Sequence, residues 1–215
     1  MLNNITPIVL RLVIANVLVF LVLALGENFI DADMYNNISH YLILFKSNLI
    51  IHRNIPDYFL PIQVVTSFFA HKTLLHIVFN MWALINFGAI IERVFGAKRF
   101  LTFYLFCGVV GSTLVALFDP TPNPVLGASG AIFGLMTAFG IYFPEQKMTF
   151  FVPIPITLSA RNWVYAFGGF SLLMVIWNFV SPEGYMGGNI SHFGHLSGMV
   201  AALIFFYSGI GSKLT

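Results

Sequence analysis

The sequence predicts an all-α membrane protein, a bundle of six transmembrane helices with both termini on the cytoplasmic side. Of its 215 residues, 58% are hydrophobic and only 8% are charged, whereas a soluble domain carries about 25% charged residues. No repeat or linker divides the chain, so residues 1–215 are expected to form one polytopic domain. Six apolar stretches are long enough to be spans, at 8–26, 74–92, 100–118, 129–143, 162–180 and 190–209.

Several classes of function are excluded by composition. The net charge is only +2 and no run of Lys or Arg occurs, so no nucleic-acid partner is expected. The lone cysteine, Cys107, excludes an internal disulfide and leaves no cysteine framework for zinc. The His-Glu-x-x-His pattern of metalloproteases is absent. We therefore expect neither a metal nor a cofactor.

The first span and the loop after it differ in character. Residues 8–26 are short enough to resemble a signal-peptide core, but Gly26-Glu27-Asn28 is a poor cleavage site, so a membrane anchor is expected. The long outer loop 27–73 mixes charged residues with an apolar piece at 59–70. We expect a structured loop that lies partly in the membrane interface. Its histidines are expected to be solvated: His40, His52 and His71.

The distribution of Lys and Arg sets the orientation. If the N-terminus is cytoplasmic, seven of the ten basic residues fall on the inner side. The other three lie in the long first loop, where the rule is weak. The loops 119–128 and 181–189 contain no Lys or Arg. An N-in, C-in topology follows, and the second, fourth and sixth spans then run from outside to inside.

The fourth span is too short to cross a bilayer alone. Gly130 to Phe143 is 14 residues, about 21 Å of helix against a hydrocarbon core of roughly 30 Å. If Pro144 marks the inner end, Ser129 lies below the outer surface, where a loop is tolerated only among protein or water. Ser129 can be a plain N-cap. It can also be a nucleophile whose oxyanion would meet the free N–H groups of the helix N-terminus.

Polar residues inside the membrane are costly and mark functional sites. His76 and Asn80 are spaced i,i+4 on one face of the second span, and the sixth span carries His192 and His195. In the predicted topology, His76, Ser129 and His195 all lie near the outer ends of their spans. Three unrelated polar groups would have no reason to agree in depth.

Small residues indicate close helix packing. Gly130 and Gly134 form a Gly-x-x-x-Gly face on the fourth span, and Gly194, Gly198 and Ala202 form a ridge on the sixth. If these faces pack together, His195 comes within reach of Ser129. Ordinary membrane-helix packing is the alternative interpretation.

In combination, these residues resemble a known family. His76-x-x-x-Asn80, Gly127-x-Ser129-Gly130 and Gly194-His195-x-x-Gly198 are similar to the signature of the rhomboid intramembrane serine proteases. The resemblance covers nearly the whole chain. One departure is in the first loop, where many members have a Trp-Arg pair and this chain has Ile62-Gln63.

The resemblance implies a mechanism and a set of site residues. His195 would be the general base for Ser129, and the oxyanion would be held by the Ser129 backbone N–H with the side chains of Asn80 and His76. Phe133 would pack on the His195 imidazole. Gly127, Gly130 and Gly198 would support this geometry. No carboxylate has a spacing that points to His195, so a Ser–His dyad is expected. His192 is the rival base, and we expect it to be a solvated rim residue.

The implied function is intramembrane endopeptidase activity on other membrane proteins, near small residues in transmembrane segments that unwind easily. Membrane lipids are the other expected partners. The glycine-rich loop 181–189 could act as a cap, and Trp177 and Phe179 in the fifth span could form a lateral gate. The alternative is a non-catalytic relative that binds membrane clients, although such relatives lack the serine or histidine. A transporter or channel would need pore charges or inverted repeats, which are not seen. The expected location is the cell membrane (the inner membrane in a bacterium), with the site open to the extracytoplasmic side.

Overall fold

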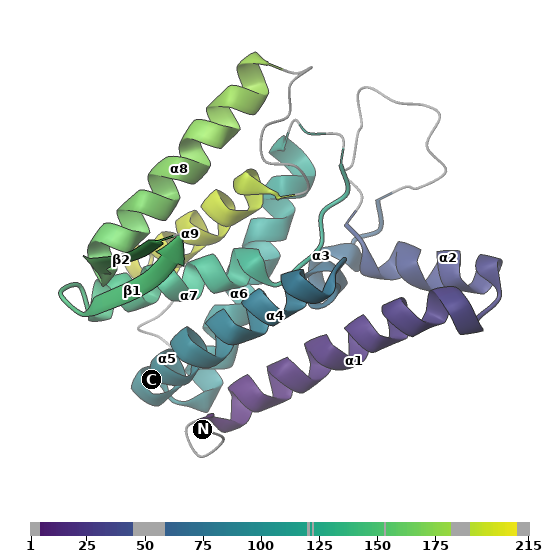
Figure 1. Ribbon diagram of the computed structural model, residues 1–215, viewed down its shortest axis with the longest axis horizontal. Coiled ribbons are helices and arrows are strands. Elements are labelled where there is room, and N and C mark those ends of the chain that lie inside the picture. The colour runs from purple at the N-terminus through teal and green to yellow at the C-terminus, as the bar shows by residue number, and fades with distance from the viewer. Residues whose placement is uncertain are drawn as a thin grey trace.

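The computed structural model describes residues 5–44, 59–119, 121, 123–152, 154–181 and 190–209. They form a mostly helical bundle (Figure 1). The α-helices are α1 (Pro7–Phe29), α2 (Ala32–Leu42), α3 (Gln63–Thr66), α4 (Leu74–Ala83), α5 (Ala89–Phe95), α6 (Ala97–Phe118), α7 (Ser129–Tyr142), α8 (Ala160–Val180) and α9 (His192–Tyr207). A 3-10 turn, η2 (Ser67–Phe69), follows α3, and a π-helical segment, η3 (Leu84–Gly88), joins α4 to α5.

Four of the described helical segments are long and apolar enough to cross a membrane, judged by length and composition alone: Pro7–Gly26, Leu74–Phe95, Ala97–Phe118 and Ala160–Val180. The other two apolar helices, α7 and α9, have 14 and 16 residues. Each corresponds to one of the six apolar stretches in the sequence, with ends that differ by at most three residues. Hydropathy therefore locates the helices well, including the short one that begins at Ser129.

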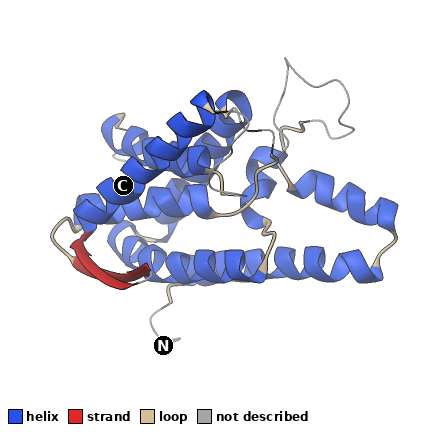
Figure 2. Ribbon diagram, turned by 45° about the horizontal axis from the view of Figure 1, so that its top comes forward, coloured by secondary structure: helices blue, strands red, loops and turns tan. Residues whose placement is uncertain are grey.

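A β-hairpin interrupts the expected all-α fold. β1 (Lys147–Val152) pairs antiparallel with β2 (Ile154–Ser159), with Lys147 opposite Ser159, and Figure 2 shows the hairpin at one end of the bundle. The expectation of an all-α protein was wrong at this point, which lies between the fourth and fifth predicted spans. The hydroxyls of Thr149 and Thr157 lie 2.8 Å apart across the strands, a cross-strand pair that favours this pairing.

The second span is continuous from Leu74 to Phe95 but changes its hydrogen bonding at η3. Such π segments are often found near functional sites in helices. Gly88 ends η3, and a Cβ atom at this position would lie 3.0 Å from Cγ2 of Val9. The absent side chain therefore lets α1 approach the second span closely.

Glycines also bring α6, α7 and α9 together at the centre of the bundle (Figure 1). A Cβ atom on Gly198 of α9 would lie 1.9 Å from the backbone oxygen of Gly130 in α7. A Cβ atom on Gly134 would lie 2.7 Å from the Cys107 sulfur of α6. The backbones of these helices touch directly, which is how small residues drive helix association in membranes. The surrounding core is rich in aromatic side chains, among them Phe100, Phe103, Tyr104 and Phe205.

The N-terminus of α1 is capped by a carboxylate from another helix. Glu92 of α5 is buried and accepts hydrogen bonds from the backbone N–H groups of Ile8 (3.1 Å) and Val9 (2.9 Å) and from the Thr6 hydroxyl. These are N–H groups that a helix cannot satisfy internally. The contact attaches α1 to the end of the second span.

The described parts of the first loop are structured, as expected. Gln63 is buried, and its side-chain amide donates to the His40 carbonyl (2.8 Å), which ties α3 to the end of α2. Gln63 thus links the two described helices of the first loop. Leu44 exchanges two backbone hydrogen bonds with Val125, just before the site loop. His52 lies outside the described residues.

Candidate active site

Ser129 is the first residue of α7, and its hydroxyl does not cap that helix. Instead, Ser129 Oγ lies 3.0 Å from His195 Nε2. The simple N-cap interpretation of Ser129 is therefore wrong. Its neighbour Gly127 has φ of +117°, a backbone conformation that residues with a side chain rarely adopt. The turn that this glycine allows places Ser129 beside the histidine.

His195 is held in place by stacking. Its ring lies 4.0 Å from the Phe133 ring, with an interplanar angle of 9°. Phe133 stands four residues after Ser129, hence on the same face of α7. Because Nε2 faces a hydroxyl donor, the neutral tautomer with its proton on Nδ1 would leave Nε2 free to accept. Stacking on Phe133 limits rotation of the imidazole about its Cβ–Cγ bond, so Nε2 stays directed at the Ser129 hydroxyl.

The contact between α7 and α9 fixes the spacing of this pair. Gly198 lies one turn after His195, and Gly130 directly follows Ser129. A Cβ atom on Gly130 would also lie 3.3 Å from the Gly194 backbone oxygen. Any side chain at these glycines would push the helices apart and lengthen the distance between Ser129 and His195.

The amide of Asn80 is positioned to serve as a donor. Asn80 is 7% exposed, and within the described part of the chain its Nδ2 has no hydrogen-bond partner. A buried amide donor without a partner is unusual. His76, one turn earlier on α4, lies against the site loop, since a Cβ atom on Gly127 would be 2.7 Å from its Nε2. Both side chains border the peptide that leads into Ser129.

These groups surround one cleft of about 910 Å³. Ser129 and His195 line it together with His76, Asn80 and Phe133. The remaining walls come from α1, α2, α8 and the loop before α7, including Phe20, Tyr35, Val125 and Asn178. A polar patch thus lies inside a mostly apolar wall. This arrangement suits the binding of a largely apolar ligand that a few polar groups orient.

His71 was expected to be solvated, and this was wrong. It is 2% exposed, and its Nε2 accepts from the backbone N–H of Ala128 at 3.5 Å, while Nδ1 lies 3.3 Å from the Phe69 carbonyl. Its ring packs edge-on against His76, 4.9 Å away. Burial, and then the neighbouring His76, lower the pKa of His71 from 6.5 to about 4. The sequence analysis did not predict the contact between His71 and Ala128, although the apolar residues before His71 indicated that this part of the loop is buried.

His192 was also expected to be solvated, and it is buried as well, at 5% exposure. Its ring stands edge-on to His195 at 5.9 Å and to Phe170 of α8 at 5.3 Å. Of the two histidines at the start of α9, it is His195 whose nitrogen contacts Ser129. His192 lies behind the pair, on the side of α8.

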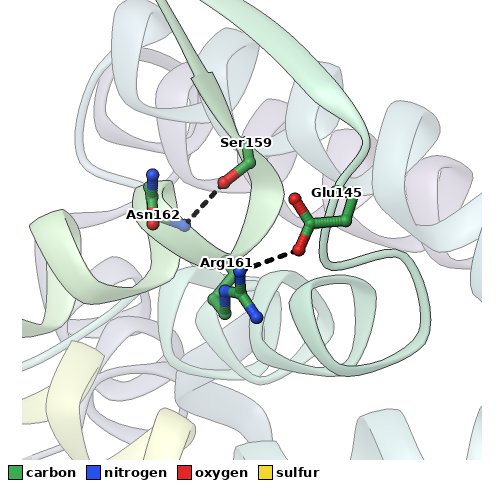
Figure 3. Close-up of polar contacts among 4 residues, drawn as sticks. All are labelled: Glu145, Ser159, Arg161 and Asn162. Atoms are coloured by element: carbon green, nitrogen blue, oxygen red, sulfur yellow. Dashed lines mark hydrogen bonds and ion pairs between the residues drawn. The ribbon is translucent and has the colours of Figure 1, made fainter.

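Four carboxylates are candidates for a third catalytic member, and the three that the structure describes make other contacts. Glu92 caps α1, and Glu145 pairs with Arg161 at 2.7 Å near the hairpin (Figure 3). Asp119 accepts from the Thr121 N–H at 3.0 Å and from the Ser191 hydroxyl at 3.5 Å. Glu183 lies outside the described residues. In the described ranges, no three His, Cys, Asp or Glu side chains are grouped so that they could hold a metal ion.

Residues 61–211 match the sequence model of the Rhomboid domain. The chain belongs to the rhomboid family. The matched segment of this rhomboid runs from before α3 through α9 and contains Ser129, His195, His76, Asn80 and Phe133, whereas the cleft walls from α1 and α2 precede it.

Three curated relatives illustrate the range of the family. The mitochondrial Rhomboid protein 1 of Saccharomyces cerevisiae is 32% identical over 67% of this chain and 40% of its own length. Rhomboid protease GluP of Bacillus subtilis is 31% identical over 64% of this chain and 24% of its own length. The mitochondrial RHOMBOID-like protein 12 of Arabidopsis thaliana is 31% identical over 92% of this chain and 56% of its length. The rhomboid chain thus spans only part of these relatives.

Proposed function

We propose that this rhomboid is an intramembrane serine endopeptidase that acts through a Ser129–His195 dyad. The observation that carries the proposal is the 3.0 Å contact between Ser129 Oγ and His195 Nε2 in the wall of a large cleft. A nucleophile within hydrogen-bond reach of an oriented base is the arrangement that acyl transfer requires. Stacking on Phe133 takes the orienting role that a carboxylate has in a triad.

In the first half of the reaction, His195 Nε2 takes the proton from Ser129 Oγ as the oxygen attacks the peptide carbonyl. The oxyanion that forms is held by the Ser129 backbone N–H and by the side chains of Asn80 and His76. The buried and unpartnered Asn80 amide supports this role. The imidazolium then gives its proton to the leaving amine, the C–N bond breaks, and an acyl-enzyme remains.

In the second half, water replaces the amine. His195 takes a proton from the water as its oxygen attacks the acyl carbon, the bond to Ser129 Oγ breaks, and the proton returns to Ser129. A neutral amide and a neutral imidazole donate hydrogen bonds without burying a net charge, which suits a site below a membrane surface.

We further propose one domain over residues 1–215, with six spans, both termini cytoplasmic and the site open to the extracytoplasmic side. Together with the four long apolar helices, the shorter helices α7 and α9 would make six transmembrane spans. Both begin beside the contact between Ser129 and His195. The distribution of Lys and Arg supports this topology. The proposed location is the cell membrane, the inner membrane in a bacterium. Reporter fusions after Lys98 and after Asp119 test the topology, because they should lie on opposite sides of the membrane.

The proposed substrates are membrane proteins with a transmembrane segment that unwinds easily, and lipids would surround the enzyme. Trp177 and Phe179 of α8 are exposed, at 43% and 56%, so they could face lipid or an entering helix. The proposed cap, 181–189, lies outside the described residues apart from Ser181.

A fluorophosphonate probe tests the proposal against the alternative of a non-catalytic client binder. The probe phosphonylates only an activated serine. It should label the wild type and fail to label Ser129→Ala. Labelling that persists in the variant would disprove the assignment of the nucleophile, and no labelling of folded wild type would favour the client binder.

A further inference from the structure

A second and much smaller cavity lies beside the cleft, and we call it the satellite cavity. It has about 10 Å³ of space for the centre of a water molecule, which is about the minimum for one water. Asp119 after α6, Asn178 near the end of α8, and Ser191 and His192 at the start of α9 line it. Polar and apolar side chains both line this small cavity, and the apolar ones are Val175, Ile190 and Phe193.

Two buried polar atoms in this wall have no partner among the residues that the structure describes: Asn178 Oδ1 and His192 Nδ1. His192 is only 5% exposed. Buried polar groups in folded proteins are nearly always hydrogen-bonded, and ordered water often supplies the missing partner. Asn178 and His192 come from different helices and line the same small cavity, which gives both atoms access to the same ligand.

We propose that the satellite cavity binds one water molecule that bridges α8 and α9. The amide oxygen of Asn178 can only accept, so the water donates to it. The water then accepts from Nδ1–H of His192, and the carboxylate of Asp119 or the hydroxyl of Ser191 serves as its third partner. With this water in place, Asn178 Oδ1 and His192 Nδ1 each have a hydrogen-bond partner.

The position of this water connects it with the reaction, a step that rests on the proposed function. Thr121, Asn178, Ile190 and Ser191 line both the satellite cavity and the cleft. The His192 and His195 rings are 5.9 Å apart. A substrate helix in the cleft displaces the water there, whereas a water behind this shared wall is retained. We infer that the satellite cavity supplies the water that hydrolyses the acyl-enzyme.

A crystal structure at a resolution that shows ordered water tests the binding site directly. The expected result is a water peak within hydrogen-bond distance of both Asn178 Oδ1 and His192 Nδ1. A dry cavity would overturn the proposal. This measurement does not depend on whether the protein is a protease.

Kinetics test the role of the water with Asn178→Leu and His192→Leu. Rates of labelling by the fluorophosphonate, which needs no water, should stay near the wild-type value. Deacylation of a substrate acyl-enzyme should slow by about tenfold, as for one lost hydrogen bond. His192→Asn keeps a polar atom near the Nδ1 position and should restore much of the rate. Val180→Leu, at an exposed position on the same helix, is the matched control.

The outcomes separate this inference from the proposed function. Absence of labelling in the wild type would disprove the protease proposal. The water site would then be tested by the crystal structure alone. Normal labelling with unchanged deacylation in both leucine variants would overturn the supply of water from the satellite cavity. Equal loss of labelling and deacylation would also overturn it, because the damage would then lie in the dyad.

Discussion

The Ser129 hydroxyl and the His195 imidazole act as one unit in the proposed reaction, because the 3.0 Å contact between them is where the proton moves. Ser129→Ala and His195→Ala should therefore each lower turnover of a membrane-embedded substrate by roughly 10⁴-fold or more. The double variant should be no worse than either single one. Cleavage assays in detergent or liposomes measure this, and additive losses would show that the two residues act separately.

Asn80 contributes through its unpartnered amide, which in the proposal is satisfied only when the oxyanion forms. Asn80→Ala should lower kcat by about 10²–10³ with little change in KM, the usual effect of removing one oxyanion donor. Asn86→Ala serves as a control, since that amide bonds to the Trp82 carbonyl one turn away in the same span. A rise in KM with unchanged kcat would assign Asn80 to substrate binding instead.

His71 makes stability depend on pH. Its folded pKa of about 4 is below the ordinary value of 6.5, so the unfolded chain takes up a proton before the folded chain does. This contribution is complete above pH 6.5 and is lost as the pH falls toward 4, about 3 kcal/mol in all. His71→Gln keeps an acceptor for Ala128 but does not titrate. Chemical denaturation between pH 7 and 4 should show a flatter profile for His71→Gln, and identical profiles would contradict this.

Spacing along the sequence selected five residues that the structure places around the cleft, Ser129, His195, His76, Asn80 and Phe133, and their catalytic roles stay predictions. His76 and Asn80 share a helix face, and Ser129 begins its helix, as the i,i+4 spacing and the length of the fourth span predicted. The errors were at His71 and His192, both expected in water and both buried. Their burial depends on the first loop folding back over the site and on α8 packing beside α9. Local patterns carry no information about such contacts.

Among the elements, the pair α7 and α9 depends most on the absence of side chains. A Cβ atom at Gly198 would lie 1.9 Å from the Gly130 oxygen, so Gly198→Ala must separate the two helices. We expect a loss of stability of about 1–3 kcal/mol or more, with activity falling further because the Ser129–His195 distance grows. Thermal unfolding and cleavage rates measure the two effects.

The matched control is Gly169→Ala on α8, where a Cβ atom would meet nothing within 4 Å. This variant should be as stable as the wild type or slightly more stable, because alanine favours a helix over glycine by about 1 kcal/mol. If Gly198→Ala and Gly169→Ala behave alike, the α7–α9 contact does not set the geometry of the dyad.

Hydropathy found the six apolar helices, and among the elements that it missed are the β-hairpin and the π segment. The hairpin strands have six residues each, and the prolines at 153 and 155 favoured a loop. The strands still form because Phe150 packs on aromatic rings of other elements, a long-range contact. The π segment η3 was missed since its apolar pattern is the same as that of the helix around it. Both features come from packing and not from local propensity.

At the scale of the whole molecule, the cleft has walls from both the α4 side and the α8 side. In the proposed function, a substrate helix enters between them, so a cross-link that joins the halves of α4 and α8 nearest the site should abolish cleavage of a membrane-embedded substrate. Labelling by a small fluorophosphonate should persist. Unchanged cleavage after complete cross-linking would remove α8 as a lateral gate.

The family could be predicted from three short patterns, which contain His76 and Asn80, Ser129, and His195. Each pattern lies on a different helix, and the combination is informative because it is expected where the three helices meet. The match of residues 61–211 to the Rhomboid domain agrees with that expectation. Which membrane holds the protein, and which substrates it would meet in the proposed function, depend on cellular sorting and on encounter. The spacing of Ser129 and His195 in the sequence carries no information about either of these.

Phe150 of the hairpin bears on a different property, the permeability of the bilayer. Its ring contacts Trp82 of α4 at 5.9 Å and Trp163 of α8 at 4.8 Å. The hairpin follows the end of α7 opposite to Ser129, about 21 Å along the helix. If α4 and α8 part at the site, this aromatic seal keeps them joined at the far end. In the proposed topology, the cleft would then admit water from one side of the membrane while the other end of the two helices stays closed.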